Sequence, residues 1–139
     1  MEKSIIYQIF PRYWGDRAGK QKKGGTLDEN GCGKFSNIDT ESLDYFKSLG
    51  ITHLWLTGIV RHATGESTGG CRASSPDWVK GRAGSPYAIT DYYDVNPYLA
   101  DVPERRMEEF RDLVKRIHEA GLKVIIDFVP NHVARDYAA

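Results

Sequence analysis

Apolar residues along this chain fall into two patterns, short dense runs and longer stretches with helical spacing. The dense run over residues 4–10 is rich in β-branched and aromatic side chains and is stopped by Pro11, which predicts a strand. A second strand is expected over residues 51–57. The run over residues 122–129 is apolar at almost every position, which is typical of a parallel strand covered on both faces.

Two stretches between these strands carry apolar side chains spaced as on one face of a helix. The first predicted helix covers residues 38–49, and Gly50 follows it directly before the next strand. The second covers residues 103–120, begins with a proline that suits a first helical turn, and is followed by Gly121. Single glycines that join a helix to the next strand are typical of α/β units.

Long polar segments follow the first two strands. Residues 15–35 and 61–85 are rich in glycine and are expected to be loops. A (β/α)8 barrel places its chemistry on the loops after its strands, so this asymmetry favours that fold. A doubly wound open sheet has the same alternation, but its phosphate-binding glycine pattern is missing after the first strand. The pattern predicts an α/β fold, the first three β/α units of a TIM (β/α)8 barrel, incomplete in this chain.

The overall composition narrows the classes of partner. The chain has 19 basic and 19 acidic residues, so nothing in its charge favours nucleic acid or a membrane surface. No run approaches the ~20 apolar residues of a membrane span, and the N-terminus lacks the apolar stretch of a signal peptide. We therefore expect a cytoplasmic location for the chain as written, or a periplasmic or secreted one if a signal was removed.

The strongest motif ends the third strand. Residues 124–132 read Val-Ile-Ile-Asp-Phe-Val-Pro-Asn-His, and this segment resembles the first conserved region of the α-amylase family of glycoside hydrolases. Residues 6–12, 50–56 and 85–97 resemble, in order, that family's first strand, second strand and following aromatic segment. The resemblance covers nearly the whole chain, and it implies that residues 1–139 are the N-terminal portion of an α-amylase-type catalytic barrel domain.

Five residues become site candidates through this resemblance. An imidazole can donate a hydrogen bond to a sugar hydroxyl, and an amide oxygen can join the oxygen ligands of a hard cation. The resemblance accordingly implies that His132 contacts the sugar at the cleavage subsite, that Asn131 is a possible calcium ligand, and that Asp127 holds the local hydrogen-bond network. Tyr87 would stack on the same sugar, and Asp91 would be structural.

Simpler interpretations of the same residues stay open. Taken alone, Asp127 is a loop cap, His132 a half-buried imidazole and Tyr87 a packing side chain. The chain also departs from the family pattern, because Pro86 stands where many members have glycine before the tyrosine. Some exo-acting members carry an aspartate at the position of Gly84, which weakens an exo-glucosidase interpretation.

The catalytic carboxyl groups are not expected in this chain. Retaining glycosidases use two carboxyl groups about 5–5.5 Å apart, and in the family resembled these come from the fourth and fifth strands. A complete barrel needs about 250 residues, against 139 here. We therefore expect a segment of a retaining glycoside hydrolase acting on α-glucans or α-linked oligosaccharides, inactive by itself and prone to associate through open sheet edges.

Two other functions remain open at this point. One is a non-catalytic α-amylase-like barrel protein, such as a transporter accessory chain, and the other is a stand-alone glucan-binding module. The intact set Asp127, Asn131 and His132 favours the enzyme, and exposed sheet edges argue against an independent module. The glycosidic linkage, endo or exo action, and hydrolysis or transfer are not determined by the sequence.

Overall fold

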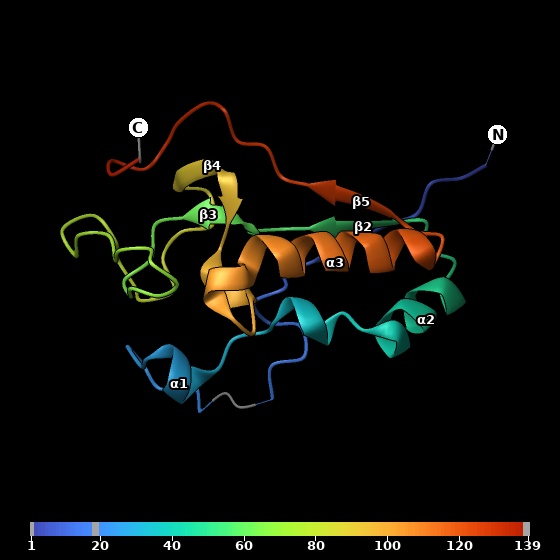
Figure 1. The fold of residues 1–139 in the computed structure, drawn as a ribbon, viewed down its shortest axis with the longest axis horizontal. Coiled ribbons are helices and arrows are strands. Elements are labelled where there is room, and N and C mark those ends of the chain that lie inside the picture. The colour runs from blue at the N-terminus through green and yellow to red at the C-terminus, as the bar shows by residue number, and fades with distance from the viewer. Residues whose placement is uncertain (1, 18–19, 138–139) are drawn as a thin grey trace.

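A three-stranded parallel sheet forms the centre of the molecule. The computed structural model describes residues 2–17 and 20–137 (Figure 1). The strands are β1 (Ile6–Ile9), β2 (His53–Leu56) and β5 (Lys123–Ile126), in the order β1-β2-β5. β2 pairs with both neighbours in parallel, with Trp55 opposite Gln8 and Ile125. The carboxyl ends of the three strands therefore meet at one edge of the sheet.

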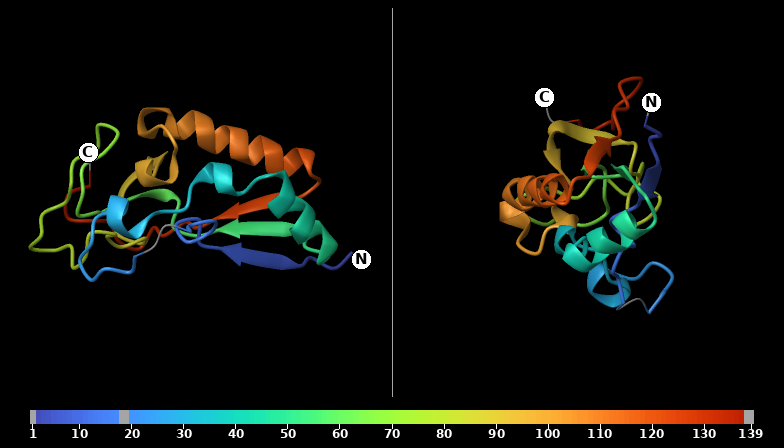
Figure 2. Two further views of the ribbon diagram at one scale, coloured as in Figure 1. Left: turned by 90° about the horizontal axis from the view of Figure 1, so that it is seen from below. Right: turned by 90° about the vertical axis from the view of Figure 1, so that its right-hand side faces the viewer.

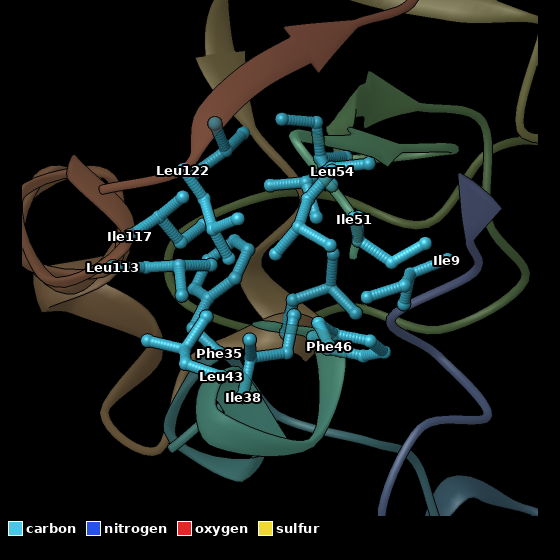
Figure 3. Close-up of a cluster of buried hydrophobic side chains, with 14 of the residues drawn as sticks. Ile9, Phe35, Ile38, Leu43, Phe46, Ile51, Leu54, Leu113, Ile117 and Leu122 are labelled. Atoms are coloured by element: carbon cyan, nitrogen blue, oxygen red, sulfur yellow. The ribbon is translucent and has the colours of Figure 1, made fainter. Parts of the chain in front are cut away.

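Two helices, α2 (Thr40–Ser48) and α3 (Arg106–Glu119), cover one face of this sheet (Figure 2). Side chains along a strand alternate between faces, so Leu54 and Leu56 of β2 both point to the helices, where they are buried. Figure 3 shows Leu54 among the core side chains contributed by the helices and strands. The opposite face carries no helix within residues 2–17 and 20–137, and Ile6 is exposed there.

Local sequence signals explain where the helices begin and end. α2 starts after Asp39, whose Oδ1 accepts a hydrogen bond from the Ser42 amide (2.9 Å). A short 3-10 turn, η3 (Pro103–Arg105), precedes α3, so the stretch predicted as one helix consists of two connected elements. The glycine after each helix has a positive φ, 77° after α2 and 82° after α3, a conformation that glycine adopts without strain.

Two segments that were expected to be loops contain regular structure. At the start of the second, β3 (Val60–His62) pairs antiparallel with β4 (Ile89–Val95), which follows that segment, and the two form a separate sheet. The two strands lie far apart in sequence, and β3 itself is too short to show a period-two pattern. Within the first, α1 (Leu27–Asn30) is a single turn stabilised by a capping box. The remaining 3-10 turns are η1 (Phe35–Asn37) and η2 (Pro97–Leu99).

The arrangement places the irregular segments at one end of the molecule. The β3–β4 pair lies beyond the carboxyl ends of the parallel strands (Figure 1). Among the described residues the parallel sheet has two outer strands, β1 and β5, so it is open rather than closed into a barrel. The described part of the chain has no helix of the length and apolar character required to cross a membrane.

Candidate functional site

The carboxylate of Asp127, directly after β5, is held by Trp55 of β2. Trp55 Nε1 donates a hydrogen bond to Asp127 Oδ1 (2.5 Å). The register explains this contact, because Trp55 is opposite Ile125 and a residue two positions further along β5 points to the same face. The second carboxylate oxygen, Oδ2, is buried and has no hydrogen-bond partner in the described chain. Asp127 is thus anchored through one oxygen at the carboxyl end of the sheet.

Tyr92 of β4 fixes the backbone of the segment that follows β5. Its hydroxyl hydrogen-bonds to the carbonyl oxygen of Val129 and also approaches that of His132 (3.3 Å). Its ring contacts two aromatic rings of the same segment, with 5.7 and 5.8 Å between centroids. The sequence indicated only a packing role for Tyr92. The structure adds that the aromatic strand β4 supports the residues around His132.

Asn131 and His132 both lie exposed on this segment. Nδ1 of His132 hydrogen-bonds to the amide oxygen of Asn131. An amide oxygen can only accept, so Nδ1 carries the proton and Nε2 of the neutral ring is left as an acceptor. No described residue occupies Nε2. The ring nitrogen open to a ligand is therefore Nε2, which accepts a hydrogen bond in this tautomer of the neutral ring.

Tyr87 lies on a tight turn before β4, and 42% of its surface is exposed. The Ala88 amide donates to the Ser85 carbonyl (3.1 Å), so Pro86 and Tyr87 are the two central residues of a β-turn. Proline is favoured at the first of these positions, which gives Pro86 a local physical reason. In the described chain no hydrogen bond or ring contact joins Tyr87 to His132. The two candidates are both available to a ligand but are not brought into contact with each other.

Asp91 and Asp94 of β4 share an ionic network with two arginines. Nη1 of Arg61 lies 3.8 Å from Asp91 and 3.5 Å from Asp94. Arg106 of α3 binds both oxygens of Asp94, with two N–H groups at 2.8 Å. This pairing raises the pKa of Arg106. The network ties β4 to β3 and α3, and sequence reasoning missed Arg106 because its partner belongs to a different element.

His62, at the end of β3, is a buried residue that the sequence did not single out. Its Nδ1 lies 2.9 Å from the Val60 carbonyl and so carries the proton, while Nε2 accepts from the Asn96 amide (3.1 Å). The orientation of that amide is fixed, because its oxygen accepts from the Tyr98 backbone (3.2 Å). Burial lowers the pKa of His62 to about 4, and Arg12 acts in the same direction. His62 is therefore neutral near pH 7.

The described residues do not assemble a calcium site. Calcium takes about six to eight oxygen ligands. The described residues contain no group of three or more Asp, Glu, His or Cys side chains placed to hold a metal ion. Asn131 offers one amide oxygen, and that oxygen already accepts a hydrogen bond from His132. The described residues therefore do not fit a calcium ion by themselves.

Comparisons with known proteins identify the family. The family profile described as "Alpha amylase, catalytic domain" matches residues 8–139. This chain belongs to the α-amylase family of glycoside hydrolases. The trehalose-6-phosphate hydrolase of Bacillus subtilis is 32% identical to it over 98% of the chain and 18% of that protein. An amino acid transporter heavy chain of Mus musculus is 33% identical over 77% of the chain and 12% of that protein.

The solved structures bear on the fold. The crystal structure of an α-amylase from Lactobacillus plantarum superposes with a TM-score of 0.67 at 30% identity, covering 97% of this chain and 24% of that chain. The predicted fold class is confirmed: the chain is part of a (β/α)8 barrel of the α-amylase type, with an open parallel sheet. The chain spans less than a fifth of the length of the curated relatives cited above.

Proposed function

We propose that this chain forms one wall of the substrate site of a retaining glycoside hydrolase that acts on α-glucans or related α-linked oligosaccharides. The observation that carries the proposal is the exposed His132, which has an open ring nitrogen on a backbone fixed by Tyr92. Family membership supplies the reaction class. Relatives named as trehalose-6-phosphate hydrolase, α-amylase and α-glucosidase support an α-linked substrate.

The proposed sugar contacts follow from the chemistry of the exposed groups. His132 would accept a hydrogen bond from a sugar hydroxyl through Nε2, while Asn131 keeps the ring in this orientation. Tyr87 would offer its exposed ring to the apolar C–H face of a pyranose. Asp127 holds the end of β5 through Trp55. Asp91 would serve the site indirectly, through its pairing with Arg61.

Bond cleavage would require carboxyl groups from outside this chain. A retaining mechanism needs one carboxylate as nucleophile and a second carboxyl group as acid and then base. Asp127 does not suit either task, because one oxygen is bonded to Trp55 and the other is buried. A calcium ion would likewise need ligands from outside this chain, because Asn131 would supply only one oxygen. We therefore expect no hydrolysis by the 139-residue chain alone.

Two measurements test this proposal. The purified chain, verified by mass, is assayed for reducing sugar released from soluble starch and maltotriose, and none above the blank is expected. Robust turnover would overturn the assignment of the carboxyl groups to other parts of a longer protein. Titration with maltose is then followed by NMR through the backbone amide signals of the segment around residue 132. The shift should vanish in His132→Ala and persist in His118→Ala, a control on the exposed face of α3. A response that survives His132→Ala would overturn the sugar contact.

A second function is favoured by one specific observation. The transporter heavy chain of Mus musculus is 33% identical over 77% of this chain, against 32% over 98% for the trehalose-6-phosphate hydrolase. A non-catalytic barrel protein is therefore the alternative to the enzyme. Any coding sequence that continues past residue 139 would decide between them. A G-x-R-x-D pattern on a fourth strand supports the enzyme, and its replacement by residues without a carboxylate supports the non-catalytic protein.

A further inference from the structure

A cavity of about 460 Å³ lies beside the segment that carries His132. Its walls come from β3 and the polar loop after it, from Thr90 of β4, and from Pro97 and Asp136. We name it the Trp78 pocket, after the one tryptophan among its lining residues, which is 43% exposed. Its volume falls in the range of about 300–1,000 Å³ that is usual for small-molecule sites.

The loop that forms this pocket is held in place by its own hydrogen bonds. Thr68 and Cys71 exchange both backbone hydrogen bonds (3.1 and 2.8 Å), and the Ser74 amide donates to the Thr64 carbonyl (2.8 Å). Arg106 of α3 donates to the loop as well, through Nη1 to the carbonyl of the glycine at position 69 (3.0 Å). Because the loop is already ordered, less conformational entropy is lost when a ligand binds.

The charged groups of the pocket balance and favour a neutral ligand. Arg61 and Arg72 stand against Glu66 and Asp136. Arg61 and Glu66 are engaged in ion pairs with residues outside the pocket. The side chains of Arg72 and Asp136, by contrast, have no hydrogen-bond or ion-pair partner among the described residues. A guanidinium that only donates and a carboxylate that only accepts match the hydroxyl groups of a sugar.

Trp78 connects the pocket to the segment that carries the proposed sugar site. The guanidinium carbon of Arg135 lies 6.0 Å from the centroid of the Trp78 ring, a cation–π contact. Arg135 and Asp136 belong to the same short segment as His132. The pocket and the proposed sugar site are therefore neighbours along this segment. An indole beside polar groups is suited to the C–H face of a pyranose ring.

We propose that the Trp78 pocket binds a further sugar unit of an α-glucan, packed on Trp78 and hydrogen-bonded to Arg72 and Asp136. The substrate class rests on the proposed function, whereas the pocket itself rests on its own lining residues. The proposed sugar site at His132 and the Trp78 pocket would then hold different units of one ligand. That ligand is an oligosaccharide of several units, because a single sugar would fill only one of the two sites.

The experiment compares binding of maltopentaose and maltose to the 139-residue chain by calorimetry and by tryptophan fluorescence. Trp78→Ala should weaken maltopentaose binding by about tenfold, the loss of roughly one aromatic contact, and leave the maltose response at His132 unchanged. Arg72→Gln, at an exposed position, provides a second variant in case Trp78→Ala fails to fold. Tyr93→Ala is the matched control, because Tyr93 is an aromatic residue that is 90% exposed outside the pocket.

The outcomes separate this inference from the proposed function. If maltopentaose binding is unchanged in Trp78→Ala and Arg72→Gln but lost in His132→Ala, the pocket is wrong and the proposed sugar site stands. If binding is lost in the pocket variants and kept in His132→Ala, the pocket stands and the His132 contact is wrong. No binding of either sugar to the unmodified chain overturns both.

Discussion

The indole N–H of Trp55 donates to the carboxylate of Asp127 and so joins β2 to the end of β5, across 72 residues of sequence. Both side chains lie on the sheet face that α2 and α3 leave uncovered. The carboxylate keeps a second, buried oxygen without a partner in the described chain. The hydrogen bond from Trp55 is therefore important for the position of the Asp127 carboxylate at this end of β5.

Removal of the Trp55 donor should destabilise the chain. Trp55→Phe keeps an aromatic ring but leaves Asp127 without its hydrogen bond, so the free energy of unfolding should fall by about 1–3 kcal/mol. Urea denaturation followed by circular dichroism measures this loss. A double-mutant cycle with Asp127→Ala, which removes the acceptor, isolates the pair. If the two losses add within about 0.3–0.5 kcal/mol, the two side chains are not coupled and the interpretation fails.

The stability of the chain should fall as the pH drops from about 6.5 to about 4, because of His62. The folded state lowers the pKa of His62 to about 4 from its ordinary 6.5, so the unfolded chain binds more protons in this window. Protonation would also set Nε2–H against the donor amide of Asn96 and the charge of Arg12. The full loss over the window is about 3 kcal/mol.

Unfolding free energies at several pH values test this dependence. His62→Gln should remove most of the pH slope between 4 and 6.5, whatever its effect at neutral pH. His118→Gln is the matched control, since His118 is exposed on α3 and should leave the slope intact. An unchanged slope in His62→Gln would show that other groups cause the dependence.

The pair of Arg106 and Asp94 should contribute much more to stability than a neighbouring surface pair. Both side chains are mostly buried, and Arg106 binds Asp94 through Nε and Nη2. Arg106→Lys keeps the charge but loses the paired geometry, which should cost about 2–3 kcal/mol. Arg105→Lys alters an exposed pair with Glu108 and should leave the melting temperature unchanged. Equal effects of the two variants would contradict this assignment.

The open sheet edges should make the isolated chain associate. β1 and β5 each lack a second neighbour in the described chain, and Ile126 of β5 is exposed. Light scattering after size exclusion should therefore show a mass that rises with concentration. Ile126→Lys should reduce this rise, because a charge on an edge strand opposes pairing. Val102→Lys, at an exposed apolar residue outside the strands, should not. A monomer at all concentrations would contradict the expectation.

The helices and their ends could be predicted because the residues that determine them are close together in the sequence. The capped start of α2 at Asp39 is readable from a few neighbouring residues, and so are the glycine ends of both helices. β3 could not be recognised in this way, since its three residues form a strand only by pairing with β4. The family could be recognised because its motifs are continuous in the chain, with Asp127 to His132 the most specific.

The sequence by itself thus determined the alternation of strands and helices, the family, and the site candidates Tyr87, Asn131 and His132. The tertiary structure decided which atoms of those residues are free and which groups hold them in place. Tyr92 of β4, 40 residues before His132, holds the backbone of that segment through its hydroxyl. Such partners come from strands far apart in the chain. Their hydrogen bonds depend on the register and burial that form when the whole chain packs, and no local pattern of residues specifies them.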